Sequence, residues 1–305
     1  MQVKVLGSAA GGGFPQWNCA CSNCARLRSG ILHGRARTQA QIAVREPGSS
    51  WCLINASPDL RTQVLSDSDF HPEKGPRHSP IAVVVLTGSE IDQVMGLLHL
   101  REFQPLRIYA TAHVTRLLRE YNSLYAALER VPGQAIWTPI WPQQPFEPAA
   151  ADGVGLNLRL EGLPLGGGAT HDASALQELD DRALGLFIEG RSGRRMFCAP
   201  ALPRLNASLL DSLEACEVIL IDGTFWSNDE LGRVRRTGKT AREMGHVPIS
   251  GGAGTLAGLA KLKRPRKIFF HVNNTNPILD EGSPEYRQVI DAGCEIAHDG
   301  MEFEL

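Results

Sequence analysis

Short apolar runs recur along the whole chain, and they constrain its fold more than any other feature of the sequence. The early runs follow one another closely, whereas a strictly doubly wound sheet would place a helix after each strand. Apolar residues at helical spacing separate the later runs. The pattern therefore predicts a layered α/β protein with two mixed sheets covered by helices. The expected strands are 3–6, 39–44, 51–54, 81–86, 184–188, 196–198, 218–221 and 268–272. The expected helices are 92–101, 114–128, 206–215, 255–262 and 284–292.

The length and composition fit one large core. The chain has 305 residues and is 43% hydrophobic. Residues 131–148 and 162–181 lack a clear period, so we expect long loops there, and such loops often carry function. We expect a single domain over residues 1–305, made of two structural halves with a seam near 131–150.

The charge balance gives no general attraction to nucleic acid or to anionic membranes, because the net charge is only -2. No apolar run approaches the roughly 20 residues of a membrane span, and the first residues do not form a signal peptide. We therefore expect a cytoplasmic protein without nucleic-acid partners. A homodimer is one option for its assembly.

Three of the seven cysteines, Cys19, Cys21 and Cys24, fall within six positions. Three thiolates at this spacing can hold one tetrahedral ion, which predicts a structural zinc with a fourth ligand from elsewhere in the chain. The alternative is three surface thiols without a metal. A catalytic zinc is less favoured, because catalytic sites keep an open position among His and carboxylate ligands. The other four cysteines are expected to be buried free thiols: Cys52, Cys198, Cys216 and Cys294.

A glycine-rich segment, residues 7–13, follows the first expected strand and imitates a dinucleotide-binding loop. Its spacing is wrong for that function, because the fingerprint G-x-G-x-x-G opens a helix, whereas here the cysteines come first.

The segment 84–98 predicts a strand, a loop and a helix, and its Asp-x-x-x-Gly-Leu ending resembles the metallo-β-lactamase motif H-x-H-x-D-H. Gly88 and Glu90 stand at the first two histidine positions, Asp92 matches the aspartate, and Gln93 replaces the last histidine. Taken alone, Asp92 could equally be a helix N-cap.

Three further polar residues stand out near the ends of apolar runs. Asp222 ends a predicted strand, His246 follows Met-Gly, and His271 ends another strand. In ordinary roles, Asp222 would cap a turn and His246 would be a hydrogen-bonded loop histidine. His271 ends an apolar strand just before the polar run Asn-Asn-Thr-Asn-Pro, so its side chain is expected to contribute little to core packing. It is therefore the strongest candidate for chemistry.

Together these motifs resemble the pyrroloquinoline quinone (PQQ) biosynthesis protein B family over nearly the whole chain. The motifs are residues 7–19, 55–59, 199–200, 222–224, 242–246, 271–280 and 299–301. The resemblance implies a metallo-β-lactamase-like four-layer αββα sandwich. It also implies a metal-dependent oxygenase or hydroxylase step on the tyrosine-derived part of the PQQ precursor; an older alternative is a carrier that moves PQQ or its precursor towards the periplasm.

The resemblance also implies roles for residues. Asp92 would be a metal ligand, Asp222 a ligand or base, and His246 a proton carrier, around a second divalent metal, iron or zinc. His271 would serve either the cysteine zinc or this cleft metal. Gln93 stands where the family has a histidine, and this difference lowers the expected affinity of the cleft for its metal ion. The implied partners are PQQ or its peptide-derived precursor and other PQQ biosynthesis proteins. Three arginines are candidates for binding the acidic quinone: Arg61, Arg101 and Arg242.

Overall fold

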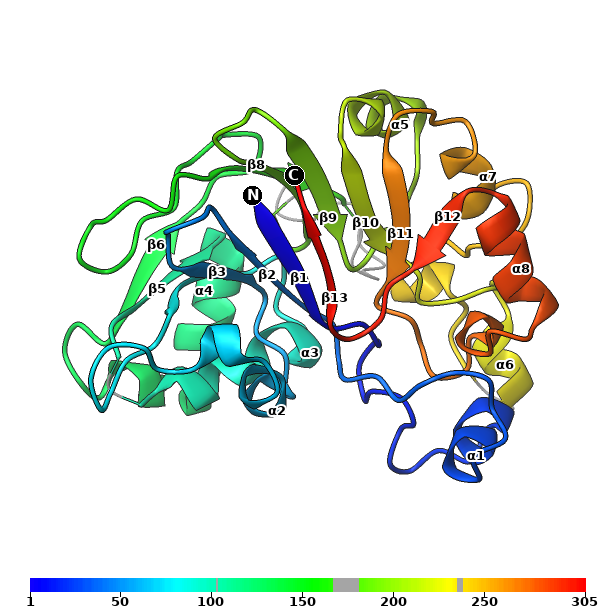
Figure 1. Cartoon of the computed structure of the whole chain (residues 1–305), viewed down its shortest axis with the longest axis horizontal. Coiled ribbons are helices and arrows are strands. Elements are labelled where there is room, and N and C mark those ends of the chain that lie inside the picture. Colours follow the sequence, from blue (N-terminus) through cyan, green and yellow to red (C-terminus); the bar gives the residue numbers. More distant parts are fainter. Residues whose placement is uncertain (103, 167–180, 235–237) are drawn as a thin grey trace.

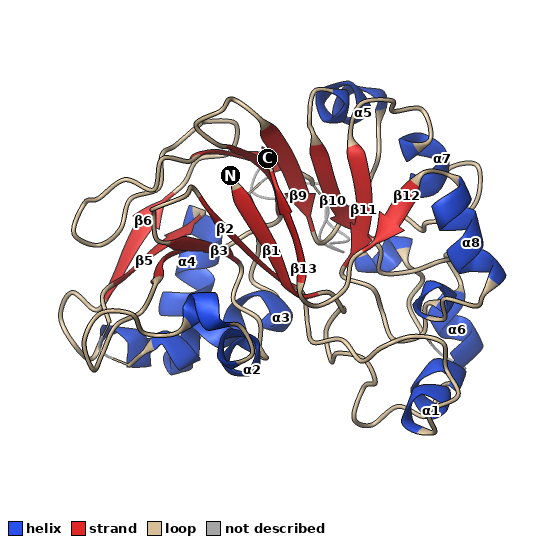
Figure 2. Ribbon diagram, viewed as in Figure 1, coloured by secondary structure: helices blue, strands red, loops and turns tan. Residues whose placement is uncertain are grey.

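Two β-sheets face each other between two groups of helices in the computed structural model, which describes residues 1–102, 104–166, 181–234 and 238–305 (Figures 1 and 2). The first sheet has the order β13 (Met301–Glu304), β1 (Gln2–Gly7), β2 (Gln41–Arg45), β3 (Trp51–Ile54), β4 (Ile81–Val85), β5 (Leu106–Ala110) and β6 (Ala135–Pro139). The second has the order β12 (Cys294–Ile296), β11 (Arg266–Phe270), β10 (Val218–Asp222), β9 (Arg195–Ala199), β8 (Leu184–Glu189) and β7 (Arg159–Pro164).

Both sheets are mixed, as the sequence predicts. In the first sheet, β13 to β3 pair antiparallel and β3 to β6 pair parallel. In the second, β12 to β9 pair parallel and β9 to β7 pair antiparallel. The carboxyl ends of β4, β10 and β11 are therefore ends of parallel strands, where α/β proteins usually place their sites.

The apolar strands are continuous because both of their faces are buried. In β10, Val218 and Leu220 lie in the core between the two sheets, whereas Ile219 and Ile221 pack under the helices of the second sheet. The first sheet is covered on its outer face in the same way. The result is four layers, helix, sheet, sheet and helix, and the predicted αββα sandwich is confirmed.

The helices cover the outer faces (Figure 2). Those against the first sheet are α2 (Leu60–Leu65), α3 (Ile91–Val94) and α4 (Ala112–Arg119). Those on the side of the second sheet are α1 (Ser22–Arg28), α5 (Ala207–Glu214), α6 (Glu230–Val234), α7 (Thr255–Leu259) and α8 (Pro284–Asp291). Short 3-10 turns lie at Ser68–Phe70, Met95–Leu100, Ser123–Glu129, Arg242–Met244 and Pro277–Leu279. Among the described residues, no helix is long and apolar enough to cross a membrane.

Two of the expected loops are partly strands. The stretch 131–148 contains β6, and 162–164 belong to β7; both strands lie at sheet edges and are only partly buried, so their sequences lack a strong apolar period. Residues 167–180 of the second expected loop lie outside the described part of the chain. The chain passes from the first sheet to the second after β6 and returns to the first with β13.

Candidate functional site

Four of the predicted polar residues meet at one end of the two sheets. Asp222 is the last residue of β10, and His271 directly follows the neighbouring strand β11. Asp92 comes from α3, which follows β4 of the opposite sheet, and His246 follows the turn Arg242–Met244. The N-cap of α3 is Glu90 and not Asp92, so Asp92 lies inside the first turn and its side chain is available for another role.

His271 and Asp92 form a direct contact across 179 residues of sequence. The Nε2 atom of His271 lies 2.8 Å from Oδ2 of Asp92. Burial by itself raises the pKa of Asp92, but the bond to His271 outweighs it and holds that pKa below its ordinary value. His271 adopts a left-handed backbone conformation, with φ of 59°, which is uncommon outside glycine and concentrates at functional sites.

A second pair joins Asp222 and His246, with 2.7 Å between Oδ2 and Nδ1. Asp222 is 0% exposed, and its carboxylate also accepts bonds from the Leu202 amide and from the amide and hydroxyl of Thr224. Burial raises the pKa of Asp222, but His246 and these donors lower it below its ordinary value. Burial lowers the pKa of His246, yet the Asp222 carboxylate raises it above its ordinary value. The arrangement therefore favours a charged pair.

Thr224 connects the two pairs into one hydrogen-bonded network. Its hydroxyl donates to Oδ1 of Asp222 over 2.6 Å and lies 2.9 Å from Nδ1 of His271. Because the hydroxyl gives its proton to Asp222, it accepts one from His271 Nδ1, which leaves Nε2 directed to Asp92. The two imidazole rings also stack, with their centroids 5.9 Å apart. Both carboxylates and both imidazoles are therefore held at fixed distances within one network.

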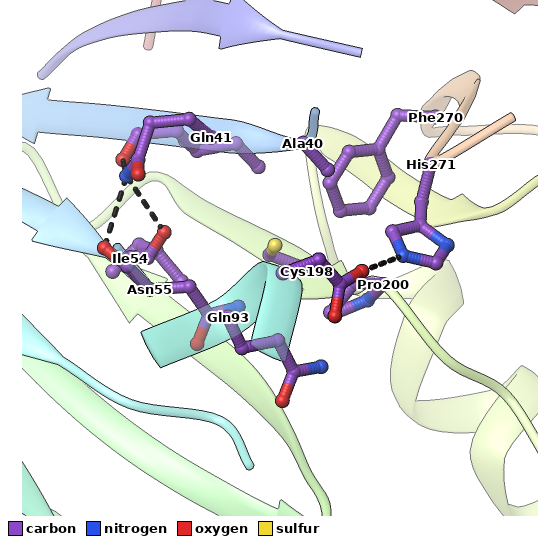
Figure 3. A pocket seen from close by; sticks show the side chains of 11 residues that line it. Ala40, Gln41, Ile54, Asn55, Gln93, Cys198, Pro200, Phe270 and His271 are labelled. Atoms are coloured by element: carbon purple, nitrogen blue, oxygen red, sulfur yellow. Dashed lines mark hydrogen bonds and ion pairs between the residues drawn. The ribbon is translucent and has the colours of Figure 1, made fainter. Parts of the chain in front are cut away.

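A small cavity of about 10 Å³, enough for roughly one water molecule, lies beside Asp92 and His271 between the two sheets. Gln93 lines it as well, and Figure 3 shows the Gln93 amide pointing away from His271. The Gln93 Oε1 atom is buried and has no hydrogen-bond partner among the residues that the structure describes. A Cβ atom on Gly88 would lie 2.4 Å from it, so the Gln93 amide fills the space left by the glycine at the first motif position. Two of the three departures from the histidine motif, Gly88 and Gln93, are thus complementary in shape.

The glycine-rich segment 7–13 joins the two sheets at this site and is not a nucleotide loop opening a helix. The Ala10 amide donates to the Val272 carbonyl over 2.9 Å, and the Val272 amide donates to the Ser8 carbonyl over 3.0 Å. Ala9 bridges both Val272 and Gln39. The backbone next to His271 is therefore held by the first sheet as well as the second.

The three clustered cysteines also come together in space. Their sulfur atoms lie within 4.8 Å of one another, with Cys24 buried and Cys19 and Cys21 partly exposed. No His, Asp or Glu of the described ranges joins them. Of the two places that the sequence left open for His271, the structure places this residue in the cleft, and Asn274 contacts the sulfur atoms instead.

The remaining cysteines and the three arginines make no hydrogen bond to the cleft network, although Cys198 lines the small cavity. All four other cysteines are buried free thiols, as predicted, and burial raises their pKa, to about 11 for Cys216 and Cys294. None of the three arginines lines the cavity: Arg61, Arg101 and Arg242 are exposed. Arg242 lies nearest in sequence to the cleft, in the turn before His246, where its guanidinium donates to the Ala253 carbonyl.

Sequence reasoning assigned no role to Thr224 or Asn274. Both stand in motifs that the sequence analysis noted, Asp-Gly-Thr and Asn-Asn-Thr-Asn. The signal that could have found them is a polar residue directly after a buried parallel strand, where side chains converge.

Comparison with known proteins shows the family and the fold. The family model described as "Beta-lactamase superfamily domain" matches residues 50–272. Coenzyme PQQ synthesis protein B of Pseudomonas protegens is 42% identical, with 100% of both chains covered, and that of Methylococcus capsulatus is 40% identical over the same shares.

Solved structures agree. The Zn²⁺-bound crystal structure of PqqB from Methylobacterium extorquens covers 100% of both chains with a TM-score of 0.90 and 36% identity. A diphosphatase of the PhnP family, at 18% identity and a TM-score of 0.68, shares the fold. The chain belongs to the coenzyme PQQ synthesis protein B family, within the β-lactamase superfamily.

Proposed function

We propose that this chain acts in coenzyme PQQ synthesis and hydroxylates a tyrosine-derived ring of the PQQ precursor with the help of a metal in the cleft. Family membership supports the pathway. The observation that carries the chemical step is the single network that joins Asp92, His271, Thr224, Asp222 and His246.

The donor set fits a divalent ion that exchanges readily. Asp92 and His271 present a carboxylate oxygen and an imidazole nitrogen to each other, and a cation can bind between these two atoms. Thr224 holds His271 in the tautomer that a metal requires, in the way outer hydrogen bonds usually orient ligand histidines. Gln93 is a poorer ligand than the histidine it replaces, so few strong ligands remain. An iron ion bound here would supply the one-electron steps of dioxygen chemistry.

The protein's own groups would manage the protons. Hydroxylation replaces a ring C–H bond by C–OH, with one oxygen atom of O₂ entering the ring and the other leaving as water. The balance requires two electrons and two protons, so an external two-electron reductant is part of the proposal. His246 keeps a proton because its pKa is raised, and Asp222 stays anionic. His246 is therefore the proton donor. Asp222 orients it and stabilises its protonated form, and the donated proton is replaced from solvent.

The cysteine cluster would hold a separate zinc. Three sulfurs this close together suit a closed structural site, and the M. extorquens relative is a zinc-bound protein. Such a metal would stabilise the fold and take no part in the hydroxylation.

A non-catalytic carrier of PQQ or its precursor is the second candidate. Gln93 favours it, because the substitution removes one strong ligand from the cleft.

One experiment separates the two functions. Iron-loaded protein is mixed with the processed precursor, a small-molecule reductant and isotopically labelled O₂, and the products are analysed by mass spectrometry. We expect a product that gains one labelled oxygen atom, and we expect Asp92→Asn and His246→Gln to abolish it. Asp211→Asn, on the exposed face of α5, is the matched control and should keep full activity. Tight binding of precursor or PQQ with no labelled product would instead establish the carrier.

A further inference from the structure

Arg182 lies just before β8, next to the loop that leads from β4 to α3. The Leu184 amide donates to the Thr87 carbonyl over 2.8 Å, which joins the two segments. A Cβ atom on Gly88 would lie 3.4 Å from the Arg182 carbonyl oxygen and 2.4 Å from Oε1 of Gln93. Arg182 and Gln93 therefore border the same glycine, at the edge of the cleft.

Both side chains carry a buried polar atom that lacks a partner. The Nε atom of Arg182 and the Oε1 atom of Gln93 make no hydrogen bond within the described part of the chain. Gln93 is only 8% exposed, whereas Arg182 as a whole remains partly exposed and can be reached from solvent. A guanidinium stays protonated, and a charged donor that is buried without an acceptor destabilises a protein more than a neutral one does. The folded chain therefore has a cation that lacks an anionic partner.

Arg37 shows how the same protein satisfies a buried arginine. Its Nε atom is also unpaired, but its Nη1 atom donates to the Ser8 hydroxyl over 3.3 Å and to the Ala297 carbonyl. Burial lowers the pKa of Arg37, and the nearby Asp299 carboxylate opposes that effect. Among the residues that the structure describes, the Arg182 guanidinium has neither an ion pair nor a hydrogen bond of this kind.

The two unpaired atoms define the chemistry of the missing ligand. It must offer an acceptor to Arg182 and a donor to Gln93. A carboxylate is the acceptor that matches a guanidinium best, because it takes two parallel bonds from Nε and a terminal nitrogen. An amino-acid unit carries an N–H group beside its carboxylate, so it supplies the donor as well. A peptide-derived molecule has such units.

The charges around the cleft make a cation necessary for an acidic ligand. The carboxylates of Asp92 and Asp222 belong to the hydrogen-bonded network, and the exposed Glu90 carboxylate caps no amide of α3. These groups would repel an acidic substrate unless a positive charge stood close by. The three arginines favoured by the sequence do not line the cavity. Arg182 is held beside this loop by main-chain bonds and can supply the charge.

We infer that Arg182 binds a carboxylate of an amino-acid unit in the precursor, and that Gln93 accepts a hydrogen bond from the neighbouring N–H group. Arg182 is then a substrate-binding residue that selects acidic molecules. The inference rests on the proposed function and extends it, because it states which group of the substrate is held and by which residues.

The test measures binding and does not depend on turnover. The processed precursor is titrated into the protein by calorimetry without O₂ or reductant, and the same molecule with its carboxylates converted to methyl esters is the neutral comparison. We expect Arg182→Gln to raise the Kd of the acid about 10- to 100-fold, because a charge-assisted contact is lost, and to leave the Kd of the ester unchanged. Arg182→Lys should lose less, because it keeps the charge but not the planar fork. Gln93→Met should raise the Kd about three- to tenfold, since it loses only a neutral acceptor.

Arg191→Gln is the matched control. It removes the same charge from the exposed turn at the other end of β8 and should bind the acid as tightly as the wild type does. Thermal unfolding of the ligand-free protein separates binding from a structural role. Because the Arg182 guanidinium has no partner among the described residues, Arg182→Gln should leave the thermal midpoint unchanged or raise it.

Several outcomes would overturn the inference. An equal Kd of the acid for Arg182→Gln and the wild type would do so, as would equal binding of acid and ester by the wild type. A clear fall in the thermal midpoint of Arg182→Gln would assign the residue a structural role instead. PQQ is titrated in parallel, and binding of PQQ that depends on Arg182 while binding of the precursor does not would reject the precursor as its ligand. A protein that binds the acid through Arg182 but forms no labelled product in the oxygen assay would support this inference and overturn the hydroxylase.

Discussion

Glu230 provides a quantitative test of how the segment around Asn274 is supported. This residue opens α6 and is 6% exposed, and its carboxylate accepts bonds from the Trp226 amide and the Thr275 hydroxyl. Burial raises its pKa from the ordinary value of 4.5 to about 7. The folded state therefore binds a proton that the unfolded chain releases between these two pH values.

The sign of the effect follows from linkage. The contribution of this carboxyl to stability is fully present below about pH 4.5 and is lost as the pH rises through about 7. A difference of about 2.5 between the two pKa values, at 1.36 kcal/mol for each pKa unit, corresponds to about 3 kcal/mol. Above pH 7 the folded protein holds a buried carboxylate at that cost.

Glu230→Gln should remove this cost, because glutamine mimics the protonated acid: its oxygen can accept from Trp226, and its amide can donate to Thr275. Urea unfolding of zinc-loaded protein at pH 5 and pH 8.5 measures the effect. We expect the variant to be more stable than the wild type at pH 8.5 by up to about 3 kcal/mol and to differ little at pH 5. Glu147→Gln, at an exposed position, is the control. An equal pH dependence in Glu230→Gln and the wild type would refute the reasoning.

Three further predictions concern the cleft and its surroundings. Gln93→His should raise the affinity of the cleft for iron or zinc about tenfold without changing metal uptake at the cysteines; metal titration checks it, and equally tight binding by the wild type would show that position 93 is not a ligand position. Asp222→Asn should lower the free energy of unfolding by about 3 kcal/mol, because it leaves the buried His246 without its charged partner; a loss below about 1 kcal/mol in urea unfolding would contradict a charged pair. Gly96→Ala should cost about 2 kcal/mol, because its Cβ would lie 2.1 Å from the Ser57 carbonyl oxygen; an unchanged thermal midpoint would show that the backbone there can shift.

Most central strands and the layer order could be predicted because their physical cause is local. The central strand β5 (Leu106–Ala110) was missed, since Arg107 interrupts its apolar run. Strands such as β10 are buried on both faces, so their sequences are apolar without interruption. Edge strands escaped prediction because one face or one edge meets solvent, as in the partly buried β6. The Met95–Leu100 segment continues the expected helix as a 3-10 turn, which an apolar period does not distinguish from α-helix.

For the site, the sequence indicated which residues are chemically unusual but not how they pair. Asp92 and His271 meet only because the two sheets face each other, and no spacing along the chain encodes that contact. For the same reason, the sequence left open whether His271 serves the cysteine zinc or the cleft metal. That Asn274, three positions later, contacts the sulfur atoms is known only once the direction of each side chain after β11 is known.

The pairing of β1 with β13 has a consequence for how the chain folds. Gln2 is paired with Glu304, so one contact of the first sheet closes a loop of nearly the whole chain. Closing such a loop reduces the conformational entropy of the chain before the strand pairing contributes any stabilisation. This order slows folding. During synthesis, the nascent chain can assemble β1 to β6 while β13 is still missing. Throughout that interval β1 keeps one unpaired edge, and such an edge can recruit strands from neighbouring nascent chains.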